Sequence, residues 1–115
     1  MKPIILSYDC TDHDPIDKWN PNDTFDVDIW MNFTIGPDIK GGDNFQVRIV
    51  TPNNLQGKNS DKHSIVLNEY SWPSVLNAVE NMLEKCKGSD WNEISNKLSQ
   101  LMYWEFDNYQ PYKGV

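Results

Sequence analysis

The sequence predicts an α+β fold: an antiparallel sheet of about four strands, with two C-terminal helices packed on one face of the sheet. Two observations lead to this prediction. Between residues 25 and 50, apolar side chains alternate with polar ones, as they do in strands that bury one face. Beyond residue 71, apolar side chains instead recur at the spacing of amphipathic helices. Strands that precede helices in this way are typical of α+β domains.

The 115 residues are predicted to form a single domain, residues 1–115, which begins with a short strand. That strand covers residues 3–9, where an apolar run is followed by a polar exit. Residues 10–24 are expected to form a loop because Asp and Pro interrupt any periodic pattern there.

The clearest strand pattern belongs to a predicted hairpin. Its first arm begins at Phe25 and ends at Gly36-Pro37, and its second arm covers residues 45–50. Gly41-Gly42 is expected in the turn, which makes the hairpin loop longer than the minimal two residues.

The second half of the chain is predicted to hold one more strand, over residues 64–68, and then the first helix. Ser71 is expected to be the N-cap of that helix, since its hydroxyl can accept from a free backbone N–H of the first turn. Gly88 is expected to end the helix in a left-handed conformation.

A second helix is predicted to begin at Asp90, because Asp90 and Glu93 have the spacing of a capping box. Beyond this helix, the aromatic segment 104–109 is expected to fold back against the edge of the core.

The net charge and the apolar runs of the sequence limit the classes of function that we expect. The formal charge is -7, from 17 acidic and 10 basic side chains. Such a field repels phosphate backbones and speeds encounter with a basic partner, although acidity also serves solubility alone. The apolar run at the N-terminus is too short for a secretion signal, and none reaches the roughly 20 residues that cross a bilayer. We therefore expect a cytoplasmic protein that binds neither nucleic acid nor membranes.

The candidate binding residues Asp26, Asp28 and Trp30 form a row on the polar face of the first hairpin arm. One interpretation is an ordinary solvated face on which Arg48 pairs with an Asp across the strands. The other is a contact surface, since an exposed Trp surrounded by acidic residues is a good anchor for a partner. Which applies depends on the face that the helices cover, and the sequence leaves that open.

A second candidate site is the Asp-rich loop, which could offer oxygen ligands to Ca²⁺ or Mg²⁺. The pattern of a calcium-binding EF-hand fails there, because no Gly stands at the turn position. Asp in loops more often forms turns and carries solvated charge, so we expect no metal and no cofactor. The loop's acidic residues are Asp9, Asp12, Asp14 and Asp17.

No catalytic site is expected. His13 and His63 lie on separate predicted loops, and neither has an evident Cys partner. Cys86 falls on the apolar stripe of the first helix, and Cys10 stands beside Asp9, whose carboxylate disfavours a thiolate. The sequence also has no Gly-rich phosphate loop, no G-x-S-x-G and no H-E-x-x-H motif. The alternative interpretation is a small metal-binding or carboxylate-based enzyme that uses loop 9–17.

The chain resembles the immunity protein 8 family of bacterial polymorphic toxin–immunity systems. The resemblance rests on segments in a fixed order, which begin at Ile35-Gly36-Pro37 and continue through residues 45–55, 63–70, Cys86-Lys87-Gly88 with Trp91 and Leu98, and 104–109. One departure is Asp61-Lys62, where the family pattern leads us to expect Gly-Arg.

This resemblance implies a small cytoplasmic protein that neutralises a cognate toxin domain by stoichiometric binding, without enzyme activity. A nuclease is offered as a hypothesis for the toxin, since an acidic inhibitor suits a basic active site. We predict Asp26, Asp28 and Trp30 as the primary interface and loop 9–17 as the secondary one, on a monomer or weak dimer. A non-toxin adaptor remains a further alternative.

Overall fold

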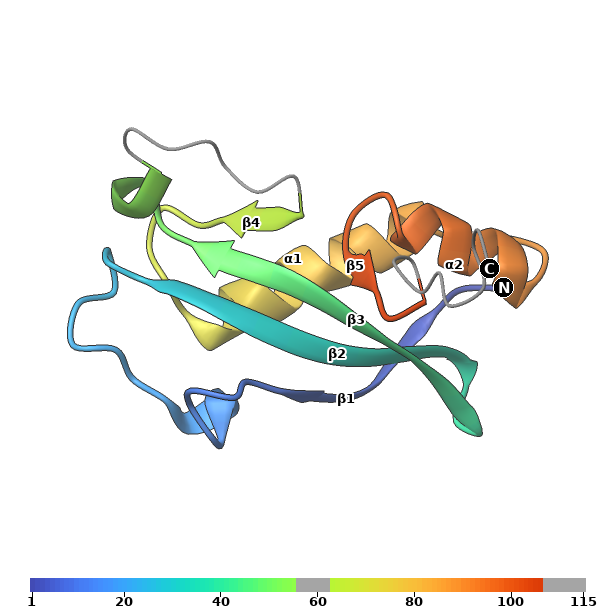
Figure 1. The fold of residues 1–115 in the computed structure, drawn as a ribbon, viewed down its shortest axis with the longest axis horizontal. Coiled ribbons are helices and arrows are strands. Elements are labelled where there is room, and N and C mark those ends of the chain that lie inside the picture. Colours follow the sequence, from blue (N-terminus) through green and yellow to red (C-terminus); the bar gives the residue numbers. More distant parts are fainter. Residues whose placement is uncertain (56–62, 107–115) are drawn as a thin grey trace, which may run out of the picture.

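The computed structural model describes residues 1–55 and 63–106. A long antiparallel hairpin of β2 (Asp28–Asp38) and β3 (Gly41–Val50) forms the centre of the sheet. Strand β1 (Ile4–Asp9) pairs antiparallel with the outer edge of β2. The other edge of β3 is shared by two short strands, β4 (Ser64–Val66) and β5 (Tyr103–Trp104) (Figure 1).

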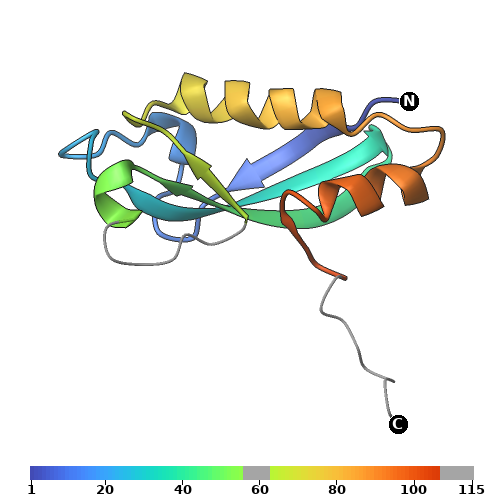
Figure 2. The ribbon, with the colours of Figure 1, turned by 90° about the horizontal axis from the view of Figure 1, so that it is seen from above.

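The predicted α+β class is confirmed, with five strands where about four were expected. Strand β5 runs antiparallel to β3, whereas β4 runs parallel to it. The two helices are α1 (Trp72–Lys85) and α2 (Trp91–Leu98), and the short 3-10 helices are η1 (Ile16–Lys18) and η2 (Pro52–Leu55). Helix α1 lies across one face of the sheet, and α2 lies next to β5 at the β3 edge (Figures 1 and 2).

One hydrophobic core joins the sheet to both helices. The alternating pattern places every second residue of 29–35 and 45–49 in this core, and all of these are at most 5% exposed. The helices add the apolar residues that their spacing predicted. The main members are Ile29, Met31, Phe33, Ile35, Phe45, Val47, Ile49, Val75, Val79, Leu83, Ile94 and Leu98.

The hairpin departs from the prediction at both ends of its first arm. Phe25 is 54% exposed in a turn, and the strand begins only at Asp28. The strand then continues past Gly36-Pro37 through a register shift, so that Asp38 pairs with Gly41 and only two residues form the loop. A side chain at Gly36 would collide with the carbonyl group of Gly41, which explains why glycine is required at this irregularity.

The helix caps are largely as predicted. Ser71 Oγ accepts from Ser74 N at 3.2 Å, and Asp90 Oδ1 accepts from Glu93 N at 2.8 Å. The carboxylate of Glu93 returns to the backbone N–H of Ser89, one residue before the cap. The expected left-handed Gly88 is wrong, because Gly88 does not have a positive φ. Its small size matters instead, since a Cβ there would stand 3.0 Å from the Glu93 carboxyl carbon.

Candidate functional site

The sheet has one face that neither α1 nor α2 covers, and we call it the open face. Figure 1 looks onto this face, with α1 behind the sheet. The strand register brings one row of its residues together across four strands: Asp9 pairs with Asn32, Asn32 with Gln46, and Gln46 with Tyr103. The open face is formed by Ser7, Asp9, Asp28, Trp30, Asn32, Thr34, Asn44, Gln46, Arg48 and Tyr103.

The predicted interface residue Trp30 lies on the open face and is 38% exposed. The helices therefore cover the opposite face, which answers the question that the sequence left open. The Trp30 ring lies 5.9 Å, centroid to centroid, from the ring of Tyr103. Tyr103 in turn packs edge-on against His63 at 4.4 Å. Trp30 is thus held on one side by another aromatic residue and reaches solvent on the other.

The predicted cross-strand pair on this face is confirmed. Arg48 Nε donates to Asp28 Oδ1 and Arg48 Nη2 donates to Asp28 Oδ2, both at 2.7 Å. Two parallel hydrogen bonds from a guanidinium form the strongest type of charge-assisted contact. The charge of Asp28 is therefore already matched within the protein.

Asp26, in contrast, does not join the row. It lies in the turn before β2, and its Oδ1 accepts from Asn54 Nδ2 at 3.0 Å. Strand β2 begins only at Asp28, and just before it the backbone N–H of Val27 donates to the hydroxyl of Thr51 at 2.9 Å. Asp26 is exposed near the open face's end but is not part of the sheet.

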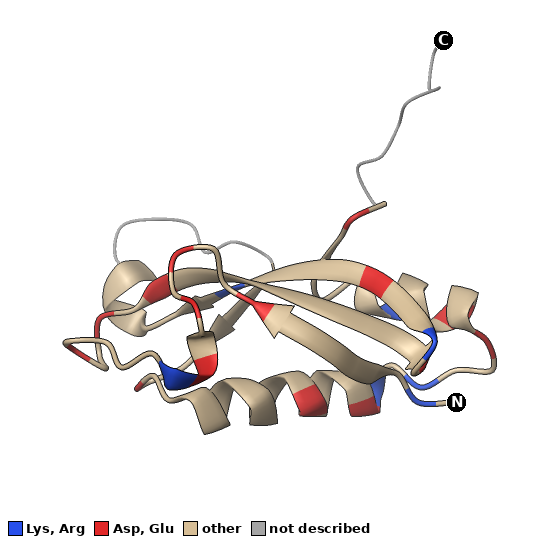
Figure 3. Cartoon of the chain, turned by 90° about the horizontal axis from the view of Figure 1, so that it is seen from below, with Lys and Arg blue, Asp and Glu red and all other residues tan. Residues whose placement is uncertain are grey.

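The Asp-rich loop does not converge on a point. Asp9 lies on the open face, where it accepts from Asn32 Nδ2 at 2.8 Å, while Asp17 lies in η1. Asp12 and Asp14 are exposed on the loop between them. Within residues 1–55 and 63–106, no three His, Cys, Asp or Glu side chains gather as in a metal site. Figure 3 shows acidic positions spaced along the loop beside β1.

Buried residues tie this loop to the rest of the fold. Ile16 and Cys10 enter the core, and the His13 ring stacks on Trp19 at 3.8 Å. A hollow of about 330 Å³ separates the loop from the start of α1, with Asp17 at its rim and Tyr70 in its wall. Burial raises the pKa of Tyr70 to about 12. Its hydroxyl is therefore protonated at neutral pH and does not act as a base.

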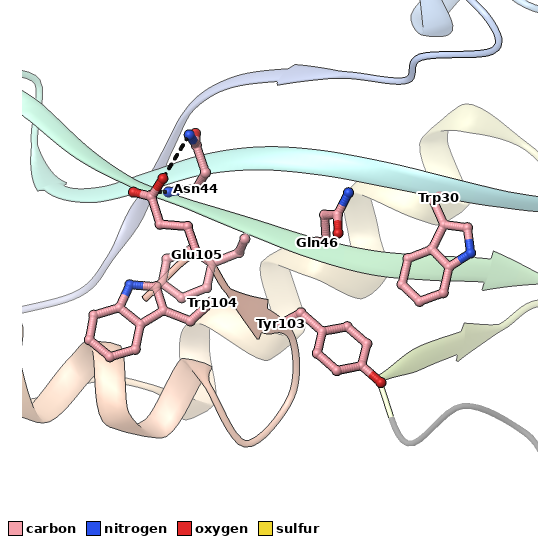
Figure 4. A pocket seen from close by; sticks show the side chains of 7 residues that line it. Trp30, Asn44, Gln46, Tyr103, Trp104 and Glu105 are labelled. Carbon is pink, nitrogen blue, oxygen red and sulfur yellow. Dashed lines mark hydrogen bonds between the residues drawn. The ribbon is translucent and has the colours of Figure 1, made fainter. Parts of the chain in front are cut away.

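A larger hollow, of about 600 Å³, lies where β5 meets the open face, and we call it the β5 pocket. Figure 4 shows the rings of Trp30 and Tyr103 at one end and the side chains of Asn44 and Glu105 at the other, with Gln46 between them. The pocket is lined by Trp30, Asn44, Phe45, Gln46, Tyr103, Trp104 and Glu105.

Sequence reasoning missed most of this pocket. The prediction for segment 104–109 was that it packs on the core edge, and Trp104 does stack on Phe45 at 6.4 Å. Residues 107–109 of that segment and the Asp61-Lys62 departure lie outside the described residues. The missed signal is the alternation within Tyr103-Trp104-Glu105, which turns the outer two residues toward the open face.

Glu105 is fixed at the pocket by the neighbouring strand. Its Oε1 accepts from the backbone N–H of Asn44 at 3.2 Å, and its Oε2 accepts from Asn44 Nδ2 at 3.1 Å. Its own backbone N–H donates to the carbonyl group of Asn44 at 2.9 Å. The carboxylate is thus held in place by neutral donors.

Among the described residues, the open face and the β5 pocket present aromatic rings, amides and carboxylates, which are groups that can bind a partner. Both thiols are buried, and burial raises the pKa of Cys86, so that it is a weak nucleophile at neutral pH. None of the helices in the described part of the chain is long and apolar enough to pass through a membrane.

Comparison with known proteins gives one match. The sequence model of a family described as Immunity protein 8 matches residues 4–109. That range contains both helices and every strand described above. No curated protein and no solved structure matches the chain significantly.

Proposed function

The chain belongs to the immunity protein 8 family, and we propose that it binds its cognate toxin domain through the open face of the sheet. The observation that carries this function is the family match over residues 4–109. As an immunity protein, the chain neutralises a toxin domain by binding it. The family points to a non-enzymatic role.

Three properties of the open face support its use as the interface. Its partner-facing residues are not needed by the core, since the core uses the opposite face of the same strands. It carries Trp30 and Tyr103, two residues of the types that dominate binding energy at protein interfaces. It is also hollowed at the β5 pocket, so that a protruding side chain of the partner can lie in it.

The acidic charge supports a basic partner. At a formal charge of -7, the chain attracts a positive surface over several ångströms and accelerates encounter with it. Toxins that cleave nucleic acid need such a surface to bind their substrate. We therefore propose a nuclease as the toxin, blocked by an inhibitor that occupies or covers its substrate site as a one-to-one complex.

We also propose that the protein acts in the cytoplasm. A toxin delivered from a neighbouring cell by contact-dependent inhibition acts after entry, so its inhibitor works in the cytoplasm. The inhibitor needs no second copy of itself, because a single open face supplies the contact surface. We therefore propose a monomer before binding.

The direct test begins with the gene immediately upstream, where we expect a large secreted protein with a variable C-terminal domain. That C-terminal domain is then expressed with and without the protein. We expect growth arrest from the toxin domain alone and normal growth when both are present. Purified together, the two should elute as a one-to-one complex. Growth arrest that this protein does not relieve would refute the assignment of that domain as its target.

Electrostatic capture has its own test. The association rate constant should fall as the salt concentration rises from about 50 to 500 mM, because the Debye length shortens from roughly 14 to 4 Å. The dissociation rate constant should change much less. An association rate that is independent of salt would remove the steering argument and leave the interface proposal intact.

A further inference from the structure

Besides Asp9, the open face and the β5 pocket beside it carry two carboxylates, Asp28 and Glu105, that differ in what holds them. Asp28 is matched by the guanidinium of Arg48, with two hydrogen bonds of 2.7 Å. Among the described residues, only the neutral donors of Asn44 hold the carboxylate of Glu105, and no Lys, Arg or His forms an ion pair with it. The negative charge of Glu105 therefore stays available to a cation from outside.

Two aromatic rings lie at the opposite end of the same hollow. Trp30 and Tyr103 contact each other at 5.9 Å with planes inclined by 39°, so part of each ring still faces the β5 pocket. Ring faces attract cations, and Trp does so most strongly. Gln46 lies between the rings and Glu105, with an amide oxygen that can accept a hydrogen bond (Figure 4).

This combination favours arginine over other side chains. Its planar guanidinium stacks on aromatic faces, offers five donors and pairs with carboxylates, while its aliphatic stem covers apolar surface. Lysine offers a point charge that keeps its water more strongly and stacks less well. A purely apolar side chain would leave the Glu105 charge and the Gln46 amide desolvated without a partner, which is costly.

We propose that the β5 pocket receives an arginine side chain of the toxin domain, with Trp30 and Tyr103 against the guanidinium or its stem and Glu105 as the countercharge. The inference rests on the proposed function, and it names the partner's chemistry at one point of the interface. Glu105, rather than Asp28 with its matched charge, then supplies the negative charge that the partner contacts.

A second copy of this chain is the weaker candidate for the pocket. Two copies at -7 each repel one another. Arg48, which is the basic residue of the open face in the described chain, is already engaged by Asp28. A basic toxin surface suffers neither disadvantage.

The test compares two variants that lose the same charge at different places. Glu105→Gln keeps an oxygen acceptor for Asn44 but removes the countercharge from the pocket. Glu80→Gln removes a carboxylate from α1, where it stands 3.9 Å from Lys2 and far from the open face. Both variants carry a formal charge of -6, so they lose long-range steering equally, and a difference between them reports the local contact.

For binding to the upstream-encoded toxin domain, we expect Glu105→Gln to raise the dissociation rate constant about tenfold, and Glu80→Gln to leave it within about twofold. Trp30→Leu, which keeps apolar bulk and removes the ring, should weaken binding by a similar factor. Thermal unfolding of each variant establishes that it is folded.

The arginine is then located from the toxin's side. Each toxin arginine is replaced by alanine, and the dissociation rate constant of each variant toxin is measured with the wild-type protein and with Glu105→Gln. For the arginine that enters the pocket, the replacement should raise the dissociation rate constant about tenfold less with Glu105→Gln than with the wild type. Equal dissociation rates for Glu105→Gln and Glu80→Gln, with the wild type still protective, would overturn this inference alone. A wild type that neither binds nor protects would overturn the proposed function and this inference together. Sedimentation that shows a dimer disrupted by Trp30→Leu, with toxin binding unchanged, would assign the pocket to self-association instead.

Discussion

The two faces of the sheet come from the same strands and from opposite halves of one alternating pattern. They are nevertheless held together by different interactions. On the face that α1 covers, residues such as Met31, Phe33 and Val47 are fully buried and contribute through packing. On the open face, neighbours such as Asn32 and Asp9 are exposed or half-buried and joined by hydrogen bonds across the strands. Burial of apolar surface supplies most of the folding free energy, so stability resides on the covered face.

This difference explains how a small protein keeps a binding surface without losing its fold. A polar open face contributes little to stability, since its side chains exchange hydrogen bonds with water for hydrogen bonds with one another. Its residues can therefore be set by the partner. The covered face leaves no such freedom, because any change in its volume is felt by the packed core.

The strongest test of this contrast is Phe33→Ala on the covered face. We expect it to lower the free energy of unfolding by about 3–5 kcal/mol, because it empties a fully buried site between the sheet and α1. Urea denaturation measures the loss. Phe25→Ala serves as the control, since Phe25 is exposed in a turn and should cost within about 0.5 kcal/mol. Equal losses for the two variants would contradict the assignment of stability to the covered face.

Trp30→Ala tests the open face. We expect it to weaken toxin binding by more than about 2 kcal/mol while lowering the free energy of unfolding by less than about 1 kcal/mol, since its ring is partly exposed. Calorimetric titration and urea denaturation measure the two quantities. Ile39→Ala removes an exposed apolar side chain from the hairpin tip and should change neither. A variant that loses stability and keeps its affinity would make Trp30 a structural residue.

How much of this could be read from the sequence depends on the range of the interactions. Alternation in residues 29–35 and 45–49 predicted both faces of the hairpin, because the period of a strand is a local property. The caps at Ser71 and Asp90 were also predictable, since each joins residues only three positions apart. These local signals sufficed for the fold class.

The β5 pocket was beyond reach for the opposite reason. Tyr103 pairs with Gln46 across 57 positions of sequence, and a two-residue strand has no period of its own. Trp30 and Asp28 were identified because they belong to the long strand. The pairing of Arg48 with an Asp of the neighbouring arm was predictable from the hairpin. The contacts of Glu105 with Asn44 were not, because the two residues lie 61 positions apart in the sequence.

Asp43 provides a test at the junction of the two faces. Its Oδ2 accepts from the indole N–H groups of Trp91 and Trp104, at 3.1 and 3.0 Å, and so fastens α2 and β5 to β3. We expect Asp43→Ala to lower the free energy of unfolding by about 1–3 kcal/mol, because two half-buried donors lose their acceptor. Asp43→Asn keeps an oxygen at this position and should cost less. Urea denaturation gives the energies, and a shift of both indole N–H signals in NMR spectra identifies the contact.

The smallest expected effect is at the start of α2, which belongs to neither face. The pKa of Glu93 is lowered to about 2, first by the backbone N–H of Ser89 and then by Lys97 and the Ser89 hydroxyl. A carboxyl group whose pKa is depressed in the folded state stabilises that state fully above the unfolded value of 4.5, and loses this contribution as the pH falls toward 2. We therefore expect the decline in stability between pH 4.5 and 2, followed by circular dichroism in urea, to be shallower in Glu93→Gln than in the wild type.

Glu84, which pairs with Lys2 and Lys87, also contributes to the decline in stability at low pH. The pKa of Glu84 is also lowered to about 2, by Lys2 first and Lys87 second, so Glu93→Gln should flatten the decline only in part. The double variant Glu93→Gln/Glu84→Gln should flatten the decline in stability further. Glu80→Gln should leave the contacts of Glu93 with Ser89 and Lys97 unchanged. The dissociation rate constant of the toxin complex at neutral pH should be the same in all of them, because none of these carboxylates lies on the open face. A Glu93→Gln protein whose toxin complex dissociates faster would place α2 in the interface, so that binding and stability would no longer reside in separate parts of the molecule.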